Sequence, residues 1–383
     1  MVDKKYDRIV VKVGSSTLTH DSGKLNLARI DHILCQLVDL KNKGKEVLLV
    51  TSGAIGAGMG EMGLEEKPKL IPEQQAAAAV GQGLLIGVYN KFLRQYGEKG
   101  AQVLLTASDL EERERYLNAF NTLLTLLEYD IIPVVNENDT VVTEEIKFGD
   151  NDTLSALVAC LIEADLLINL SDVEGFYNGD PAVEGKENLQ VIRKIKKPIS
   201  ELKEMAGVRG SKFGTGGMKT KLEAADIAVN SGITMVIGPG YEKNILLGLV
   251  DMLENNKKYS LGTTFLPVRD SLSKRKQWLN YNLSSFGSIM IDSGAEDALL
   301  YRGKSLLPGG ITDVEGEFSP GEPVLIKNQQ GEEIGKGLVN YSAEEIEKIK
   351  GYHSEEIYSL LGYINNEEVI HRDNMVIKGG DQK

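Results

Sequence analysis

The sequence predicts an α/β protein with an open, mainly parallel sheet covered by helices on both faces (three αβα layers), followed by a small, separate β-barrel-like domain. Up to about residue 265, short runs of Val, Ile and Leu alternate with stretches whose apolar residues recur about every 3.6 positions. Small, polar or glycine-rich segments follow these runs, as expected where parallel strands end at a ligand site. From about residue 275 the alternation stops, and short strands broken by Gly and Pro take over.

The apolar runs are short and rich in β-branched residues, which is typical of buried parallel strands. They cover residues 8–14, 46–52, 101–107, 131–137, 166–172 and 233–239. Helical periodicity covers residues 27–43, 73–96, 114–128 and 152–164 between them. This order predicts a sheet with a helix after most strands.

The C-terminal part has strand patterns at residues 287–292, 309–318, 322–328 and 331–342, spaced roughly as in a small β-barrel. We therefore expect an α/β domain at 1–265, a linker at 266–284, a β domain at 285–373 and a disordered tail at 374–383.

Composition excludes several classes of protein. No apolar run approaches the roughly 18 residues that a membrane span requires, and the N-terminal segment lacks the pattern of a signal peptide. Cys35 and Cys160 lie in helix-like patterns and predict core packing rather than a disulfide framework. The four histidines show no metal-ligand spacing. The sequence predicts a cytoplasmic protein without a zinc site.

The net charge of −13 argues against a protein whose main function is to bind a nucleic-acid backbone. The charge is concentrated near the C-terminus, where residues 285–373 hold 7 Lys and Arg against 17 Asp and Glu. Nucleic acid is therefore not the partner that we expect.

Lys12 lies near the end of the first predicted strand, directly before Val13 and Gly14. A buried lysine needs a partner, and at the carboxyl end of a strand a phosphate can serve, with Gly14 allowing close backbone approach. After the second strand, Ser52 and Gly53 precede a helix. The N–H groups at its start can receive an anion, or Ser-Gly can simply cap the helix.

The most polar stretch of the α/β part runs from residue 136 to 156 and contains Asp139, Asp150, Asn151 and Asp152. Asn151 or Asp152 is a candidate helix cap, but capping does not account for all four residues. Carboxylates beside lysines and phosphates orient the lysines, hold a cation-bound nucleotide, or bind a substrate ammonium.

Near residue 214 the chain reads GTGGMKTKLEAADIA, which lacks the Gly directly before Lys-Thr that a P-loop requires. Gly214, Gly216 and Gly217 nevertheless precede a predicted helix, with Lys219 and Lys221 nearby. The N-terminus of a helix attracts anions, so this stretch predicts a phosphate cradle of another geometry. With Lys12 it indicates a site for phosphoryl transfer.

These stretches together resemble the amino-acid kinase family, in particular its members that phosphorylate glutamate. The resemblance rests on motifs in family order, namely VVKVGSS, TSGAIGAG, NENDTVVTEEIKFGDNDTLSA, LSDVEGFY and GTGGMKTKLEAA. The segment GKSLLPGGITDVEGEFSPGEPV resembles the PUA domain that many of these enzymes carry. The expected fold is thus that of the amino-acid and carbamate kinases, with a PUA domain appended.

The resemblance implies transfer of the γ-phosphoryl group of ATP to the side-chain carboxylate of L-glutamate, the first step of proline biosynthesis. The residues that match nucleotide-binding positions are Lys12, Ser171, Asp172, Thr215, Gly216, Gly217, Met218, Lys219, Thr220 and Lys221. Those that match glutamate-binding positions are Ser52, Asp139 and Asn151. Ser171 stands where the family usually has Thr, and it keeps the hydroxyl.

For catalysis we assign Lys12 and Lys221 to the phosphoryl oxygens and Asp150 to holding these two lysines in place. A carboxylate with an ordinary pKa of about 4.3 is already ionised at neutral pH, so the reaction needs no general base. The family further implies Mg²⁺ dependence, a homo-oligomer (dimer or tetramer) and feedback inhibition by proline. The metal ligands are not assigned.

Two alternatives compete with this interpretation. Another member of the same fold would act on aspartate, acetylglutamate, carbamate or a nucleotide, and the long motif at residues 136–152 together with the C-terminal domain favours glutamate. An RNA-binding protein is the second, since PUA domains often bind RNA. The acidic C-terminal domain favours the enzyme, because affinity for a nucleic-acid backbone comes largely from Lys and Arg.

Overall fold

The computed structural model describes residues 6–20, 24–141, 151–179, 185–196, 199, 202, 217–255, 257–267 and 286–377. The chain divides into two compact units, Met1–Ser271 and Leu272–Lys383. Most of the predicted linker at 266–284 and residues 378–383 of the predicted tail lie outside the described residues, whereas residues 375–377 of that tail form a strand.

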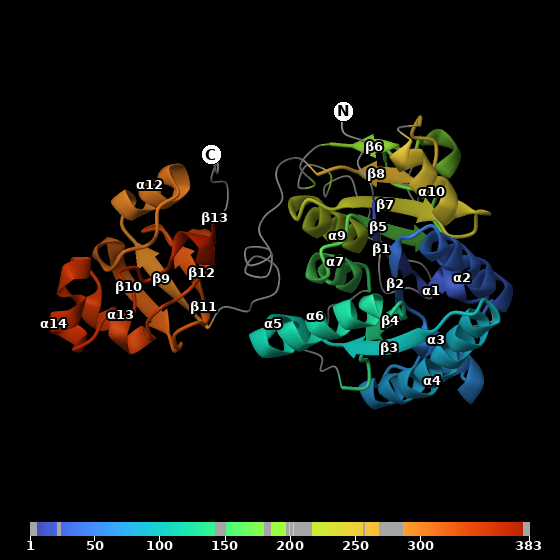
Figure 1. The fold of residues 1–383 in the computed structure, drawn as a ribbon, viewed down its shortest axis with the longest axis horizontal. Coiled ribbons are helices and arrows are strands. Elements are labelled where there is room, and N and C mark those ends of the chain that lie inside the picture. The colour runs from blue at the N-terminus through green and yellow to red at the C-terminus, as the bar shows by residue number, and fades with distance from the viewer. Residues whose placement is uncertain are drawn as a thin grey trace. The chain divides into compact units, whose positions relative to one another are not determined.

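Within the described residues, the first unit holds an eight-stranded sheet in the order β3-β4-β2-β1-β5-β7-β8-β6 (Figure 1). The strands are β1 (Arg8–Val13), β2 (Glu46–Thr51), β3 (Gly100–Leu105), β4 (Ile132–Glu137), β5 (Leu166–Ser171), β6 (Lys194–Ile195), β7 (Thr234–Pro239) and β8 (Thr263–Phe265). The first six strands in this order, from β3 at the edge to β7, run parallel to one another. Strand β8 runs antiparallel to β7. The mainly parallel sheet expected from the sequence is confirmed.

Helices cover both faces of this sheet, which gives the expected three layers (Figure 1). They are α1 (Ser15–Leu18), α2 (Leu27–Asn42), α3 (Ala54–Met62), α4 (Ile71–Gln95), α5 (Ala107–Glu111), α6 (Arg113–Glu128), α7 (Asn151–Leu161), α9 (Met218–Asn230) and α10 (Ile245–Glu254). A short 3₁₀ helix spans Lys186–Asn188.

The two faces of the central strands pack against different helices. Ile9, Val11 and Val13 of β1 belong to a buried cluster with α2, α4 and α10. Because side chains alternate along a strand, Val10 and Lys12 face the opposite side, where α7 and α9 pack side by side (Figure 1). The face with α7 and α9 therefore carries the lysine that the sequence singled out.

Helices α3 and α4 approach so closely that their contact depends on glycine. A Cβ atom on Gly58 would lie 1.8 Å from the carbonyl oxygen of Ala77, and one on Gly81 would lie 1.8 Å from that of Ala54. No side chain fits in this space, so both positions require glycine. The contact fixes the start of α3, which directly follows Ser52 and Gly53.

The second unit contains a five-stranded sheet, within its described residues, in the order β10-β9-β11-β12-β13. Its strands are β9 (Gly287–Ile291), β10 (Ile311–Gly316), β11 (Pro323–Lys327), β12 (Glu333–Leu338) and β13 (Met375–Ile377). It also contains helices that the strand patterns did not predict, α12 (Ser293–Arg302), α13 (Ala343–Ile349) and α14 (Ile357–Leu361), and 3₁₀ turns at Pro308–Gly310, Ser354–Glu356 and Arg372–Asn374.

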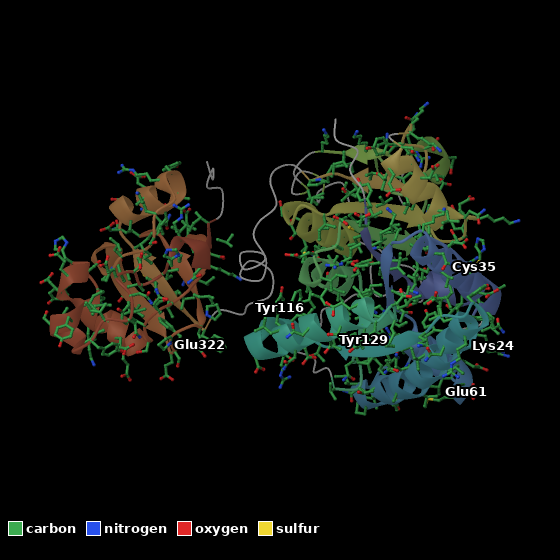
Figure 2. All side chains as sticks on the ribbon, in the orientation of Figure 1. Lys24, Cys35, Glu61, Tyr116, Tyr129 and Glu322 are labelled. Atoms are coloured by element: carbon green, nitrogen blue, oxygen red, sulfur yellow. The ribbon has the colours of Figure 1, made fainter. Side chains whose placement is uncertain are left out.

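Figure 2 shows the side chains as sticks on the ribbon and labels Cys35 on α2, together with the exposed residues Lys24 and Glu61. Cys35 is half-buried, Cys160 on α7 is buried, and both are free thiols. No helix in the described part of the chain has the length and apolar character that crossing a membrane requires.

Candidate active site

The site lies where the connectivity of the sheet reverses direction. From β1 the chain builds β2, β4 and β3 on one side, and it then returns to place β5 on the other side of β1. Ligands of open α/β sheets bind beyond the carboxyl ends of the strands at such a switch point. Strand β1 ends there and is followed by Gly14, and β5 ends there with Ser171, which is followed by Asp172.

A buried carboxylate, Asp152, lies between the two lysines that the sequence proposed. Its Oδ1 lies 2.5 Å from Nζ of Lys12, and its Oδ2 lies 3.0 Å from Nζ of Lys221. Asp152 is fully buried, and the two lysines are 3% and 7% exposed. The structure thus joins β1, α7 and α9 through one carboxylate.

Among the described residues, the carboxylate that contacts both lysines is Asp152. The sequence predicts this role for Asp150, which lies outside the described residues, and it offers Asp152 as one of the gathered polar residues and as a candidate cap of α7. Asp152 is the second residue of α7 and points inward from the first turn of the helix. A carboxylate is favoured there by the partial positive charge of the helix N-terminus.

Two further side chains contact the same carboxylate. The amide Nδ2 of Asn169 on β5 donates to Oδ1 at 2.7 Å. The hydroxyl of Thr220 lies 3.0 Å from Oδ2 of Asp152 and 2.9 Å from the carbonyl oxygen of Gly217. These two acceptors share its single hydrogen. Asn169 is not among the site residues expected from the sequence, although a polar residue inside the apolar run LLINLSD is a recognisable signal.

Among the described residues, this cluster contains two ammonium groups, those of Lys12 and Lys221, and one carboxylate, that of Asp152. Electrostatic interactions are stronger in such a buried place than in water. The cluster is suited to stabilise an anion, which is the requirement of phosphoryl transfer.

The glycine stretch of the sequence leads into α9, as expected. Gly217 is the N-cap residue of α9, and no side chain among the described residues caps this helix. The N–H groups of its first turn are thus placed to bind an anion. Met218 is half-buried and Lys219 is exposed, whereas Thr215 and Gly216 lie outside the described residues.

Ser52 is buried in the loop between β2 and α3. The following Gly53 has φ +91°, a conformation that favours glycine, and it starts α3 without a capping side chain. The loops after β1 and β2 are adjacent, because a Cβ on Gly53 would lie 3.8 Å from Cα of Ser15. The structure thus brings the Ser52 loop beside the glycine loop that follows Lys12.

Asp139 follows β4 and is half-buried. Burial raises the pKa of its carboxyl group to about 6, although the positive charge of Lys67 acts in the opposite direction. A partly desolvated carboxylate of this kind is suited to bind a cationic group of a ligand.

Asn151 is the first residue of α7, directly before Asp152, and its buried Oδ1 has no hydrogen-bond partner among the described residues. Such an acceptor is available to a ligand. Asn151 therefore offers a polar contact close to the lysine cluster.

Ser171 and Asp172 end β5. Ser171 is buried and donates its hydroxyl to Oδ1 of Asp172 at 3.0 Å, and Asp172 is exposed. No described contact joins them to Lys12 or Lys221. They lie at the same edge of the sheet as Lys12, because Val13 pairs with Leu170 in register.

The fold and the site define a phosphotransferase with an open α/β sheet. Residues 7–239 match the amino acid kinase family, and residues 287–361 match the PUA domain. A glutamate 5-kinase of Caldanaerobacter subterraneus is 52% identical over 97% of both chains. One of Carboxydothermus hydrogenoformans is 51% identical over 98% of both, and one of Thermoanaerobacter sp. is 50% identical over 97% of both. The chain belongs to the amino acid kinase family, and the relatives that match it over nearly their whole length are named glutamate 5-kinase.

Proposed function

We propose that the protein transfers the γ-phosphoryl group of ATP to the side-chain carboxylate of L-glutamate, giving L-glutamyl 5-phosphate and ADP in the first step of proline biosynthesis. The names of its full-length relatives support the substrate. The observation that carries the chemistry is the buried pair of Lys12 and Lys221 on either side of Asp152.

The nucleophile is the substrate carboxylate, whose ordinary pKa of about 4.3 leaves it ionised at neutral pH. The enzyme therefore needs no base to remove a proton. Its task is to bring two anions together and to stabilise the charge on the transferring group, which positioning and electrostatics achieve. Lys12 and Lys221 supply the positive charge, and Asp152 fixes their positions.

We assign ATP to Lys12, Ser171, Asp172 and the stretch from Thr215 to Lys221, with the phosphates at the uncapped start of α9. Mg²⁺ enters with ATP as part of the nucleotide substrate. The described residues contain no group of three or more His, Cys, Asp or Glu side chains that could hold a metal ion by themselves. The phosphates of ATP provide such oxygen ligands.

We assign L-glutamate to Ser52, Asp139 and Asn151. Asp139 binds the α-ammonium group, which restores the charge balance of its desolvated carboxylate. The uncapped start of α3 beside Ser52 offers N–H groups to a substrate carboxylate.

The substrate is tested by ADP release and by hydroxamate trapping with L-glutamate, L-aspartate and N-acetylglutamate. We expect activity with L-glutamate and near-inactivity with the other two, because aspartate is one methylene shorter and N-acetylglutamate lacks the ammonium group for Asp139. Comparable turnover of N-acetylglutamate would contradict the assignment of Asp139. Activity confined to aspartate, carbamate or a nucleotide would contradict the function.

The role of the lysines is tested by Lys12→Met and Lys221→Met, with Lys41→Met as the matched control. Lys41 is also poorly exposed and also pairs with two carboxylates, Glu98 and Asp130, but these contacts lie away from the site. We expect kcat to fall by about 10²–10³ in the two site variants, with a much smaller change in KM for ATP. Lys41→Met should lower stability and leave kcat unchanged. Near-normal kcat in the folded site variants would overturn the mechanism.

A further inference from the structure

The strands of the first unit bring one more polar side chain into the lysine cluster. Four residues form one row of register partners across the sheet, namely Val50 of β2, Lys12 of β1, Asn169 of β5 and Ile237 of β7. All four point to the face that α7 and α9 cover, and Asn169 is 0% exposed. The outer two members of this row are apolar, so the two polar members lie next to each other in an apolar surrounding.

Asn169 shares one carboxylate oxygen with Lys12. Its Nδ2 lies 2.7 Å from Oδ1 of Asp152, the same atom that accepts from Nζ of Lys12. A carboxylate oxygen has two lone-pair directions, so Oδ1 can accept from both Lys12 and Asn169. The other oxygen has Lys221 as its ammonium donor and shares the hydrogen of Thr220 with Gly217.

The orientation of the Asn169 amide follows from the charge of Asp152. A flipped amide would place its carbonyl oxygen 2.7 Å from a carboxylate oxygen, which is repulsive. With Nδ2 toward Asp152, Oδ1 of Asn169 is buried and has no hydrogen-bond partner among the described residues. An unsatisfied buried acceptor lowers stability, so Asn at this position costs the fold something that an apolar residue would not.

We propose that Asn169 is a positioning residue, which holds the carboxylate of Asp152 in the rotation that directs Lys12 at the transferring phosphoryl group. Asn169 adds a neutral donor to the carboxylate of Asp152, which already faces the ammonium groups of two lysines. An apolar side chain at this position would donate no hydrogen bond to hold the rotation of that carboxylate. Small displacements of catalytic groups have large effects on rate, of about 10²-fold for about 1 Å. This inference rests on the proposed phosphoryl transfer.

The test is Asn169→Leu in the full-length protein, measured by coupled ADP release at varied ATP and L-glutamate. Leu has nearly the same size and removes both the donor to Asp152 and the unsatisfied oxygen. We expect kcat to fall about 10- to 100-fold, both KM values to change less than threefold, and Tm to stay the same or rise. A structural role would instead lower Tm together with activity.

The matched control is Thr264→Val. Thr264 on β8 is also 0% exposed and also has a buried oxygen without a partner among the described residues, but its register partners are Val236 and Lys194. Removal of its hydroxyl should leave kcat unchanged. A drop in kcat equal to that of Asn169→Leu would show that any change in the buried interior of the sheet slows the enzyme.

A second readout is the coupling between Asn169 and Lys12. Because Asn169 acts through the Asp152 and Lys12 pair, Asn169→Leu should reduce kcat little in a Lys12→Met background. Full multiplication of the two effects would overturn the inference, as would Asn169→Leu with kcat within twofold of the parent. If the parent lacks glutamate-dependent ADP release, the proposed function fails, and the same ratios are then measured with the acceptor that the panel identifies.

Discussion

Replacing Asp152 by Asn removes the negative charge that pairs with both buried lysines, and it changes little else in size or shape. In the parent, the two ion pairs are 2.5 and 3.0 Å long and fully or almost fully shielded from water. At about 3 Å and an effective dielectric constant of about 20, each pair has a Coulomb energy of roughly 5 kcal/mol before the desolvation of the charges is subtracted. The Asn amide also points N–H groups at side chains that donated hydrogen bonds to the carboxylate, so donor faces donor.

Breaking a buried ion pair by removing one partner typically costs about 3–5 kcal/mol of unfolding free energy. For a unit of this size, that loss lowers Tm by on the order of 10 °C. The lysines also lose their common anchor and repel each other, so they move away from the positions in which they stabilise the transferring group. We therefore expect kcat to fall by about 10²–10³ as well.

We measure kcat by ADP release at a temperature and a pH where both proteins are folded. We measure Tm by calorimetry at the same pH. Glu98→Gln is the control, because Glu98 pairs with the poorly exposed Lys41 at 2.7 Å away from the site. It should lower Tm and leave kcat unchanged. Since Asp152, Lys12 and Lys221 act as a unit, Asp152→Asn combined with Lys221→Met should cost less than the product of the single effects. A folded Asp152→Asn protein with kcat within threefold of the parent would refute this account, and so would an Asp150→Asn variant that loses activity while Asp152→Asn keeps it.

Three further predictions concern other parts of the first unit. The pKa of Asp139 is raised to about 6, so KM for L-glutamate should rise as pH falls below about 6. Asp139→Asn should remove this pH dependence. A KM for L-glutamate that does not change with pH in the parent would contradict ammonium binding by Asp139. Because the folded protein holds the proton of Asp139 to a higher pH than the unfolded chain does, this group should lower the free energy of unfolding as pH rises from about 4 to about 6, as denaturant titrations can show. Gly58→Ala should lower Tm and raise KM for L-glutamate because its Cβ would meet the Ala77 carbonyl, whereas Gly83→Ala, with nothing within 4 Å, should be neutral or slightly stabilising; equal Tm values would contradict the close packing of α3 and α4. A chain ending at Ser271, the last residue of the first unit, should keep kinase activity because the proposed site residues all precede it; a folded but inactive truncation would show that the second unit contributes to the site.

The strands of the first unit were predictable because each is a short apolar run bounded by polar or glycine residues. The six runs expected from the sequence correspond to β1, β2, β3, β4, β5 and β7, and the helical patterns to α2, α4, α6 and α7. Burial on both faces makes a strand apolar along its whole length, so its signal is local. The helices of the second unit gave no such signal. In α12 only Leu299 is buried, and α13 has seven residues, so neither shows an apolar stripe long enough to identify.

The order of the residues is enough to show which kinds of groups the site contains, because Lys12, the glycine stretch before α9 and the polar stretch around residue 150 are visible in it. The contact of Asp152 with both lysines follows only from the folded chain. Lys12 and Asp152 are 140 residues apart, and Lys221 lies 69 residues beyond Asp152. Each residue turns a helix by about 100°, so the side chain that reaches the lysines depends on where α7 begins and how it packs against the sheet. The pairing of Lys12 with Asn169 depends in the same way on the register of β1 and β5, which long-range packing sets and no local pattern encodes.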